Sequence, residues 1–261
     1  MKYSNRTDTG KPGEIRYYSD IRSISIIIPA YNEEARLPQT LARIDSFLRG
    51  RRLEFYEILV VDDGSRDRTA EVAGAFAAAH PEVRVLRNPG NRGKGYSVRQ
   101  GMLEARGQWA LFTDADLSAP IEELDKLVAA VEANQAQVAI GSREIDRSLI
   151  GVHQPAFREN AGRIFNFIMR KSIGLPFRDT QCGFKLFDGR AAQAIFSRLR
   201  LERFGFDVET LFLARLLGYK GVEVGVRWNH AEGSKVGLLQ GIDGFLDLWR
   251  IRRNQWKGLY R

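Results

Sequence analysis

The sequence has very little cysteine, since Cys182 is the only one among 261 residues. A disulfide within the chain is therefore excluded, and the composition fits a reducing compartment. Long apolar runs are also absent: the longest, such as IIIPA, fall far short of the roughly 18 residues that a membrane-spanning helix needs. We therefore expect a cytoplasmic chain that is soluble or rests peripherally on the cytoplasmic face of a membrane.

Residues 1–22 are polar and lack the apolar core of a signal peptide, so they predict a flexible N-terminal arm and no secretion. Acidic residues are outnumbered, with 32 Asp and Glu against 40 Lys and Arg and a formal net charge of +8. This balance favours an anionic partner such as a nucleotide, a phosphate or an acidic membrane surface, although an ordinary basic surface would look the same.

Short β-branched runs alternate with longer helical stretches from residue 23 to residue 141. The predicted strands are 23–28, 56–61, 83–86, 109–113 and 137–141. The predicted helices between them are 34–49, 67–79, 94–106 and 120–133. This alternation predicts an α/β fold with right-handed crossovers and a mostly parallel central sheet flanked by helices.

The second half of the chain is less regular. It predicts an amphipathic helix over 158–174, a strand over 182–187, a helix over 206–218, a strand over 222–226 and a terminal helix over 237–256. Ligands of a parallel sheet bind beyond the carboxyl ends of its strands. Each of the first five predicted strands is followed by polar or glycine-rich residues, at 29–34, 62–65, 88–95, 114–116 and 142–143. We therefore expect one edge of the sheet to carry the chemistry.

Asp114 and Asp116 follow the fourth strand and are separated by one residue. Two carboxylates at this spacing suit a hard divalent cation that also binds substrate phosphates. A helix cap is the alternative, because an aspartate before Pro120 could accept from free amides at the start of 120–133.

Asp62 and Asp63 have a similar ambiguity, because either could accept from a nucleobase N–H or cap the helix that follows. The segment 88–101 contains four glycines together with Arg92, Lys94 and Arg99, so it could approach and neutralise a diphosphate. It has neither the Walker GxxxxGK[ST] order nor a GxGxxG motif, which argues against an ATPase or a dinucleotide-binding protein.

Four motifs in this order resemble the family 2 glycosyltransferases of GT-A fold: PAYNEE (29–34), VVDDGSRDRT (60–69), GKGYSVRQGM (93–102) and DADLSAP (114–120). Three later stretches resemble more narrowly the dolichyl-phosphate β-glucosyltransferases and related polyprenyl-phosphate glycosyltransferases: DTQCGFKLF (179–187), FDVETL (206–211) and EVGVRWNHAEGSKV (223–236). The resemblance covers roughly residues 23–255, and the ordered set is highly specific.

The resemblance implies that a sugar nucleotide binds at the carboxyl edge of the sheet. Pro29, Tyr31 and Glu33 would line the nucleoside pocket. Asp62 or Asp63 would recognise the base, which is expected to be uracil.

The resemblance also implies the groups around the diphosphate. Lys94 would help to hold the nucleotide, Asp114 would contact it, and Asp116 would be the ligand of Mg²⁺ or Mn²⁺. Arg143 is a candidate for phosphate binding, with a surface cation at a strand end as the alternative.

The implied reaction is an inverting transfer in which a nucleophile attacks the anomeric carbon as the nucleoside diphosphate leaves. An alcohol acceptor would need a base, for which Glu209, with Asp207, is the candidate. A polyprenyl phosphate needs none, because the second phosphate pKa is about 6. Both acidic residues would then orient basic groups, accept sugar hydroxyls or form an acidic first helical turn.

An acceptor phosphate requires cations opposite the donor, each of which could equally be a solvated surface charge. The candidates are Arg158, Arg163, Lys185, Ser234 and Lys235. A lipid acceptor also requires contact with an anionic membrane surface, for which 165–169 and 245–261 combine apolar side chains with cations. Alternatively, both segments pack their apolar faces on the domain.

We therefore expect the arm 1–22, a glycosyltransferase domain 23–236 and a basic amphipathic helix 237–261. Within the domain, 23–143 would bind the nucleotide sugar and 144–236 the acceptor. The expected activity is transfer from UDP-glucose to a polyprenyl phosphate; the alternatives are a GDP-mannose donor or a soluble acceptor. A basic nucleic-acid-binding protein would not explain two acidic pairs at the ligand edge, which would repel phosphates without a metal. Nothing in the sequence indicates the oligomeric state.

Overall fold

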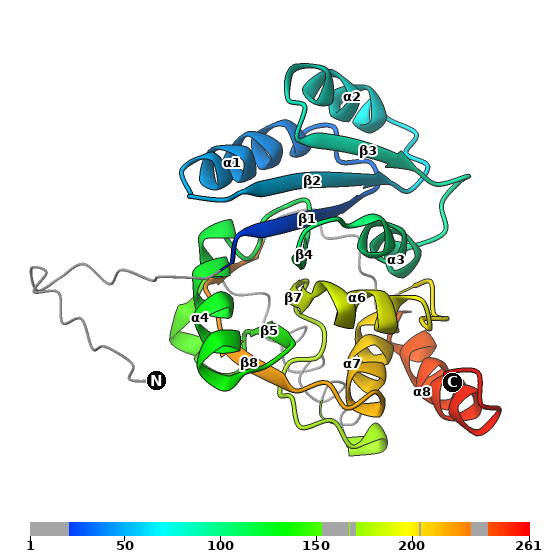
Figure 1. Cartoon of the computed structure of the whole chain (residues 1–261). Coiled ribbons are helices and arrows are strands. Elements are labelled where there is room, and N and C mark those ends of the chain that lie inside the picture. The colour runs from blue at the N-terminus through cyan, green and yellow to red at the C-terminus, as the bar shows by residue number, and fades with distance from the viewer. Residues whose placement is uncertain (1–20, 153–166, 168–170, 204, 231–239) are drawn as a thin grey trace, which may run out of the picture.

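The computed structural model describes residues 21–152, 167, 171–203, 205–230 and 240–261, and for 240–245 the backbone alone. Its centre is a seven-stranded sheet in the order β3-β2-β1-β4-β7-β5-β8 (Figure 1). The strands are β1 Ser23–Ala30, β2 Phe55–Asp62, β3 Val83–Arg87, β4 Trp109–Thr113, β5 Val138–Ser142, β7 Phe184–Asp188 and β8 Gly221–Gly225. All are parallel except β7, which is antiparallel to both β4 and β5.

Helices cover both faces of the sheet. They are α1 Leu37–Arg49, α2 Thr69–Ala79, α3 Lys94–Glu104, α4 Leu124–Asn134, α6 Gly189–Phe196, α7 Phe206–Leu216 and α8 Gln240–Trp256, with short 3₁₀ turns η1 Ile121–Glu123 and η2 Arg147–Leu149. A second, two-stranded sheet pairs β6 Ile150–Val152 with β9 Trp228–Asn229. No helix within the described ranges is long and apolar enough to span a bilayer.

Strand alternation divides the core into two layers, one on each face of the sheet. In β1, Ile26 and Ile28 pack with α1 and α4, whereas Ile27 packs on the other face with α3, α6 and α7. The same alternation holds in β2, where Val60 and Val61 face opposite layers. A sheet buried on both faces explains why these strands are almost continuously apolar.

The first five predicted strands and the helices between them are confirmed, with ends that shift by a few residues. The helix predicted over 120–133 begins as η1 and continues as α4. The mostly parallel sheet is also confirmed, and the predicted strand 182–187 is the antiparallel β7. Of the helix predicted over 158–174, only residue 167 and residues 171–174 are described.

The predicted domain division stays a prediction. Of the arm 1–22, only residues 21–22 are described, and Ile21 is buried in the core. Because β1, β2, β3, β4 and β5 run in the same direction, the loops that follow them meet at one edge of the sheet. This carboxyl edge is where the predicted site residues can converge.

Candidate active site

The loops after β1 and β2 are tied together at the carboxyl edge. Asn32, in the left-handed region with φ of 53°, donates its backbone N–H to the Ser65 hydroxyl at 3.0 Å and accepts from the Arg66 N–H at 2.8 Å. The Glu33 N–H donates to the Thr69 hydroxyl at 2.7 Å. Three residues at the end of β1 and in the loop that follows it were predicted to line the nucleoside pocket, and all three are half-buried: Pro29, Tyr31 and Glu33.

Asp62 and Asp63 are both buried but have different partners. Both carboxylate oxygens of Asp63 hold the next loop, because they accept from the Asn88 side chain at 2.7 Å and from the backbone N–H groups of Arg92 and Gly93 at 3.0 and 2.8 Å. Asp62 uses only Oδ1, which accepts from the Ser65 N–H at 3.1 Å. No described residue donates a hydrogen bond to its buried Oδ2, although the Arg87 Nε lies 3.5 Å away.

This difference separates the two aspartates chemically. A buried polar atom without a hydrogen bond costs free energy, so Asp62 Oδ2 is suited to accept from a ligand. Asp63 instead holds the glycine-rich loop 88–95 in place through its hydrogen bonds. The loop after β2 and the loop after β3 also approach closely at Gly64. A Cβ on Gly64 would lie 2.6 Å from the Gly90 carbonyl carbon, and its φ of 70° also favours glycine.

Asp114 begins the loop after β4 and forms an ion pair with Lys94, with 2.5 Å between Oδ1 and Nζ. Lys94 opens α3, so the pair joins two neighbouring loops. Gly183 lies next to Asp114, because a Cβ on Gly183 would clash with the Asp114 carboxylate. The two meet because Thr113 pairs with Phe184 in the antiparallel β4–β7 ladder.

Asp116 lies in the tight turn that follows and is only partly buried. Its Oδ1 accepts from the Ser118 N–H at 2.9 Å, and Leu117 adopts a φ of 46°. The Thr40 hydroxyl of α1 donates to the Ala115 carbonyl at 2.6 Å and anchors the turn to the core. No side chain caps η1 or α4, so the helix-cap alternative is not supported.

Five charged side chains form what we call the acid–lysine cluster: Asp114, Asp116, Asp207, Lys94 and Lys185. Burial alone would lower the pKa of Lys94, but the surrounding carboxylates, first Asp114 and then Asp207, raise it. Burial raises the pKa of Asp207 although Lys185 opposes this effect. With three carboxylates and two ammonium groups, the ionised cluster carries one net negative charge, which favours a cation.

The carboxylates of this cluster have the chemistry of a Mg²⁺ or Mn²⁺ site. Hard divalent cations prefer oxygen ligands, and Mg²⁺ usually takes one or two carboxylates together with phosphate oxygens. Among the described residues there is no group of three or more His, Cys, Asp or Glu side chains that could hold a metal by itself. A cation at Asp116 would therefore need the substrate's diphosphate as a further source of ligands.

Two predicted site residues lie in the interior of the domain. Lys185, expected to bind the acceptor phosphate, is completely buried in β7, where its Nζ pairs with Asp207 and donates to the Cys182 carbonyl at 2.7 Å. Glu209, the candidate base for an alcohol acceptor, is also completely buried. Its Oε2 accepts from the backbone N–H groups of Arg200 and Leu201 at 3.0 and 2.7 Å, and its Oε1 accepts from the Tyr260 hydroxyl.

Helix geometry explains why Asp207 and Glu209 differ. Residues two apart on a helix do not share a face, so Asp207 points to the acid–lysine cluster while Glu209 points to the C-terminal segment. Burial raises the pKa of Glu209, since the carboxylate is removed from water. The structure therefore assigns Glu209 to the packing of the C-terminal segment.

Arg143, at the end of β5, makes a bidentate ion pair with the fully buried Asp179, with Nε–Oδ2 and Nη2–Oδ1 distances of 2.7 and 2.9 Å. The guanidinium lies 5.4 Å from the centre of the Trp228 ring. Burial would raise the pKa of Asp179, but Arg143 keeps it low. Sequence reasoning did not single out Asp179, although it opens the quoted DTQCGF motif. Phosphate binding by Arg143 stays a prediction.

Four further predicted acceptor residues lie outside the described residues: Arg158, Arg163, Ser234 and Lys235. Their roles stay predictions as well. The structure brings the other predicted donor residues to one edge of the sheet, where the loops after β1, β2 and β4 and the start of α3 meet.

Replacing Tyr260 by phenylalanine is expected to lower the free energy of unfolding by about 1–3 kcal/mol, because a buried carboxylate oxygen loses its donor. Urea unfolding measures this, with Tyr219→Phe as the control at a half-buried tyrosine.

Glu209→Gln should retain turnover with a phosphate acceptor within a few-fold. A loss of turnover in Glu209→Gln as deep as that caused by an Asp116 variant would return Glu209 to the reaction.

The fold has solved counterparts. The glucosyl-3-phosphoglycerate synthase from Mycobacterium tuberculosis, in complex with UDP, superposes with a TM-score of 0.64 at 19% identity, covering 95% of this chain and 86% of that one. The same synthase in complex with Mn²⁺, UDP and glucosyl-3-phosphoglycerate also gives a TM-score of 0.64 at 19% identity, covering 94% and 86%. At this identity the likeness establishes the GT-A fold that the sequence motifs imply.

Sequence comparison identifies the family. The dolichyl-phosphate β-glucosyltransferase of Drosophila melanogaster is 42% identical over 251 residues, which cover 90% of this chain and 77% of the fly protein. The human enzyme of the same name is 36% identical over 256 residues, covering 93% and 79%. The family model for "Glycosyl transferase family 2" matches residues 25–196. The chain is therefore a glycosyltransferase and belongs to glycosyl transferase family 2.

Proposed function

We propose that this chain transfers glucose from UDP-glucose to a polyprenyl phosphate such as dolichyl phosphate, with inversion at the anomeric carbon. The names of its relatives support the donor sugar and the class of acceptor. The observation in the structure that carries the proposal is that a buried Asp62 oxygen without a hydrogen bond and the acid–lysine cluster lie at the same edge of the sheet. The first suits a nucleobase and the second a metal-bound diphosphate.

The geometry of Asp62 favours uracil over guanine. Asp62 Oδ1 already accepts from Ser65, which leaves Oδ2 for one further donor. Uracil presents one N–H on its pairing edge, at N3, whereas guanine presents donors at both N1 and N2 that would engage two acceptors. A UDP-sugar therefore fits this carboxylate better than GDP-mannose does.

The diphosphate would lie between α3 and the turn after β4. Lys94 would exchange its ion pair with Asp114 for an ion pair with the diphosphate, and Asp114 could then accept from a ribose hydroxyl. Asp116 would hold Mg²⁺ or Mn²⁺, which would stabilise the charge that develops on the leaving diphosphate. Lys185 would position Asp207 close to Lys94 from within the core.

The acceptor phosphate would attack the anomeric carbon. A bond forms between a phosphate oxygen and C1, the bond from C1 to the UDP oxygen breaks, and UDP departs with the electron pair. A phosphate anion needs no general base, which agrees with the burial of Glu209. Because such an acceptor resides in a bilayer, we also propose peripheral association with the cytoplasmic face of an anionic membrane.

Mass spectrometry of reaction products tests the activity. The enzyme is incubated with UDP-glucose, UDP-galactose or GDP-mannose and with a short polyprenyl phosphate, with Mn²⁺, with Mg²⁺ or with EDTA. We expect a glucosyl-phospho-polyprenol, and its loss with EDTA. Transfer only from GDP-mannose, or only to a soluble acceptor such as 3-phosphoglycerate, would contradict the proposal.

Replacing Asp62 by asparagine is expected to weaken UDP binding by about tenfold, which corresponds to about 1.4 kcal/mol. Asparagine places an acceptor oxygen at only one of the two positions that Oδ1 and Oδ2 of Asp62 occupy, so either the Ser65 N–H or the uracil N–H would face its NH₂ group. Calorimetry with UDP measures the change. Asp188→Asn is the matched control, because Asp188 caps α6 at the opposite edge of the sheet. Equal UDP affinities for the Asp62→Asn variant and the unmodified chain would remove Asp62 from the nucleoside pocket.

A further inference from the structure

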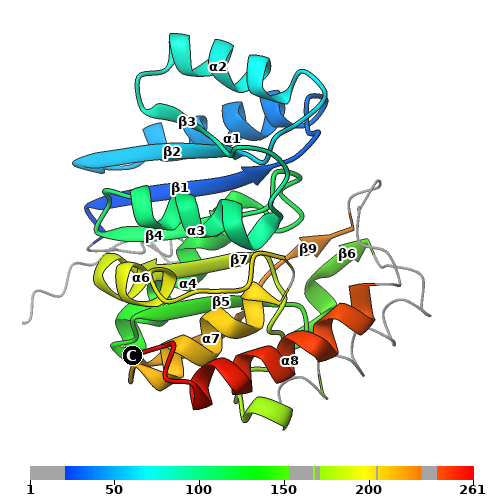
Figure 2. The ribbon, with the colours of Figure 1, turned by 90° about the vertical axis from the view of Figure 1, so that its right-hand side faces the viewer.

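One face of α8, its inner face, packs against the hydrophobic core of the domain. Leu248 and Ile251 are buried, and Figure 2 shows α8 running alongside α7. Near its middle, α8 closely approaches the start of α7, since a Cβ on Gly205 would clash with the Asp247 carboxylate. Gly205 precedes Asp207 of the acid–lysine cluster by two residues. The first half of α8 therefore lies next to the end of α7 that faces the active site.

The outer face of α8 carries large apolar side chains in contact with water. Leu246, Trp249 and Trp256 are 50%, 57% and 80% exposed. Together with Arg253, which lies 5.0 Å from the centre of the Trp249 ring, they are spaced by three, four and three residues. At 3.6 residues per turn this spacing places all four on one face, opposite the buried Ile251. We call these four residues the outer stripe.

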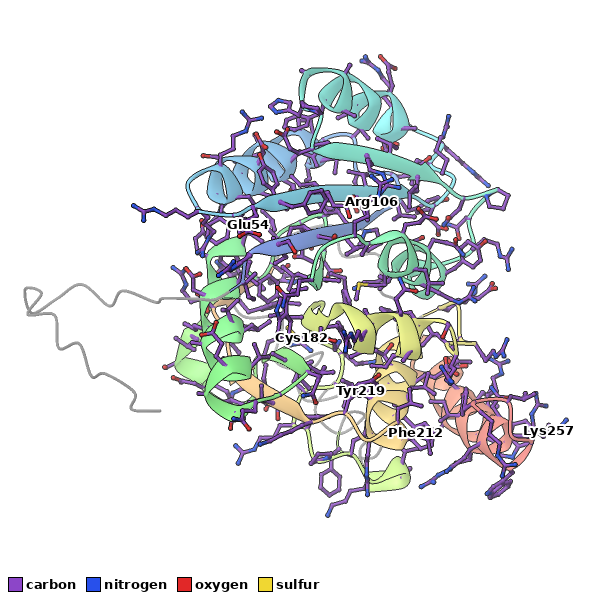
Figure 3. All side chains as sticks on the ribbon, viewed as in Figure 1. Glu54, Arg106, Cys182, Phe212, Tyr219 and Lys257 are labelled. Carbon is purple, nitrogen blue, oxygen red and sulfur yellow. The ribbon has the colours of Figure 1, made fainter. Side chains whose placement is uncertain are left out.

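Positive charge surrounds the outer stripe. Residues 246–261 contain five basic residues and one acidic residue, so this short segment supplies half of the chain's net charge of +8. The single acidic residue, Asp247, is buried and pairs with Arg250 at 2.7 Å. By helical position Arg250 and Lys257 lie along one border of the stripe and Arg252 along the other. Figure 3 shows Lys257 at the outer side of α8, directed away from the sheet.

Apolar surface continues beyond the helix. A hollow of about 600 Å³ lies beside Trp256, with Leu216 and Leu217 of the α7 end among its lining residues and Arg252 and Arg261 among its cations. Leu216 is itself 43% exposed. Exposed tryptophan and leucine bordered by arginine and lysine are typical of helices that lie in a membrane interface.

We propose that the outer stripe of α8 docks flat on an anionic phospholipid surface and brings the acid–lysine cluster to the bilayer. The inference rests on the proposed lipid acceptor and assigns the contact to named residues. Charge complementarity selects this occupant: anionic headgroups neutralise the net charge of +4 that the five basic and one acidic residues of 246–261 carry, whereas a second copy of the chain would bring the same positive charge to this surface. The tryptophan rings would lie at the level of the headgroups, with the cationic ends on the lipid phosphates.

Vesicle flotation tests the contact without any substrate. The protein is mixed with phosphatidylcholine vesicles that contain either no or about one-third phosphatidylglycerol, at low and at high salt. We expect recovery with the anionic vesicles, at least a fivefold decrease in the bound fraction for Trp249→Ala/Trp256→Ala, and a comparable loss for Arg253→Glu/Lys257→Glu. High salt should weaken binding by the unmodified protein, since surface attraction is screened.

Matched controls lie near the starts of β2 and β4. Phe55→Ala removes an exposed aromatic ring and Arg106→Glu reverses an exposed charge far from α8, as Figure 3 shows for Arg106. Both should bind vesicles as the unmodified protein does. A stripe variant that floats normally, a loss of the same size in the controls, or no binding by the unmodified protein would overturn the proposal.

Two further readouts separate this inference from the proposed function. Two of the four tryptophans lie in the stripe, so anionic vesicles should shift the fluorescence to shorter wavelength, and Trp249→Ala/Trp256→Ala should abolish the shift. The same variant should keep its rate with a short, water-soluble polyprenyl phosphate and lose rate only with a long acceptor in vesicles. Vesicle binding without any transfer would refute the proposed function alone, and equal loss with both acceptors would refute the docking role.

Discussion

Replacing Asp116 by asparagine is expected to lower kcat/KM for glucosyl transfer by about 10³-fold, the size of effect that follows loss of a main electrostatic contact to a leaving group. Asparagine can still accept from the Ser118 N–H, so the turn that holds the side chain should persist. What is lost is the negative charge and a strong oxygen ligand for Mg²⁺ or Mn²⁺. The substitution thus separates coordination from the local fold.

Calorimetry provides a second readout of the Asp116 substitution. In the unmodified protein, UDP affinity should increase when Mn²⁺ is added and fall again with EDTA, whereas in Asp116→Asn it should be insensitive to either. Asp188→Asn, at the opposite edge of the sheet, should leave rate and metal dependence unchanged. If Asp116→Asn bound UDP with the normal Mn²⁺ dependence, the metal would have to be held elsewhere.

Replacing Lys185 by methionine is expected to lower the free energy of unfolding by about 3–5 kcal/mol, because removal of one partner of a buried ion pair leaves the other charge uncompensated. Lys185 is completely buried and Asp207 nearly so, and methionine keeps most of the side-chain volume. Lys126→Met is the matched control: Lys126 pairs with Glu123 but is 37% exposed, so its loss should cost less than about 1 kcal/mol. Urea unfolding measures both.

Acidification should partly rescue the Lys185 variant. Burial already raises the pKa of Asp207 above its value in the unfolded chain, and without Lys185 the pKa should rise further. The folded state then keeps a proton that the unfolded state releases, so the free energy of unfolding increases as the pH falls through the folded-state pKa toward the lower unfolded-state pKa. Lys185→Met/Asp207→Asn should lose this dependence. If Lys185→Met were fully stable but bound the acceptor poorly, the original assignment of Lys185 to the acceptor phosphate would be supported instead.

The sequence was sufficient to predict the parallel half of the sheet. Strand patterns such as SISIII and YEILVV are nearly continuous in apolar side chains because both faces are covered, and acidic or glycine-rich loops mark their ends. The direction of β7 was not predicted. Its composition resembles that of any buried strand, and only pairing with β4 and β5 shows that it runs the opposite way. That reversal places Gly183 against Asp114.

The buried environments of Lys185 and Glu209, which were not predicted, share one physical cause. Lys185 follows a glycine turn, where an exposed cation is common, yet its ammonium group is neutralised by Asp207, which is 22 residues further along the chain. Glu209 lies in an acidic first helical turn, but its partners include Tyr260, 51 residues away. Pairings of this kind depend on tertiary contacts that no local pattern encodes. The same holds for Asp62 and Asp63, which only their hydrogen bonds distinguish.

The ion pair between Lys94 and Asp114 means that these two charges of the site neutralise each other. A ligand with a diphosphate can replace Asp114 as the partner of Lys94. The Lys94 ammonium group then has an anionic partner both before and after the ligand binds. A nucleoside without phosphates offers no such exchange and leaves the pair closed. The site would therefore distinguish UDP from uridine by competition for a single lysine, before any contact with the sugar is made.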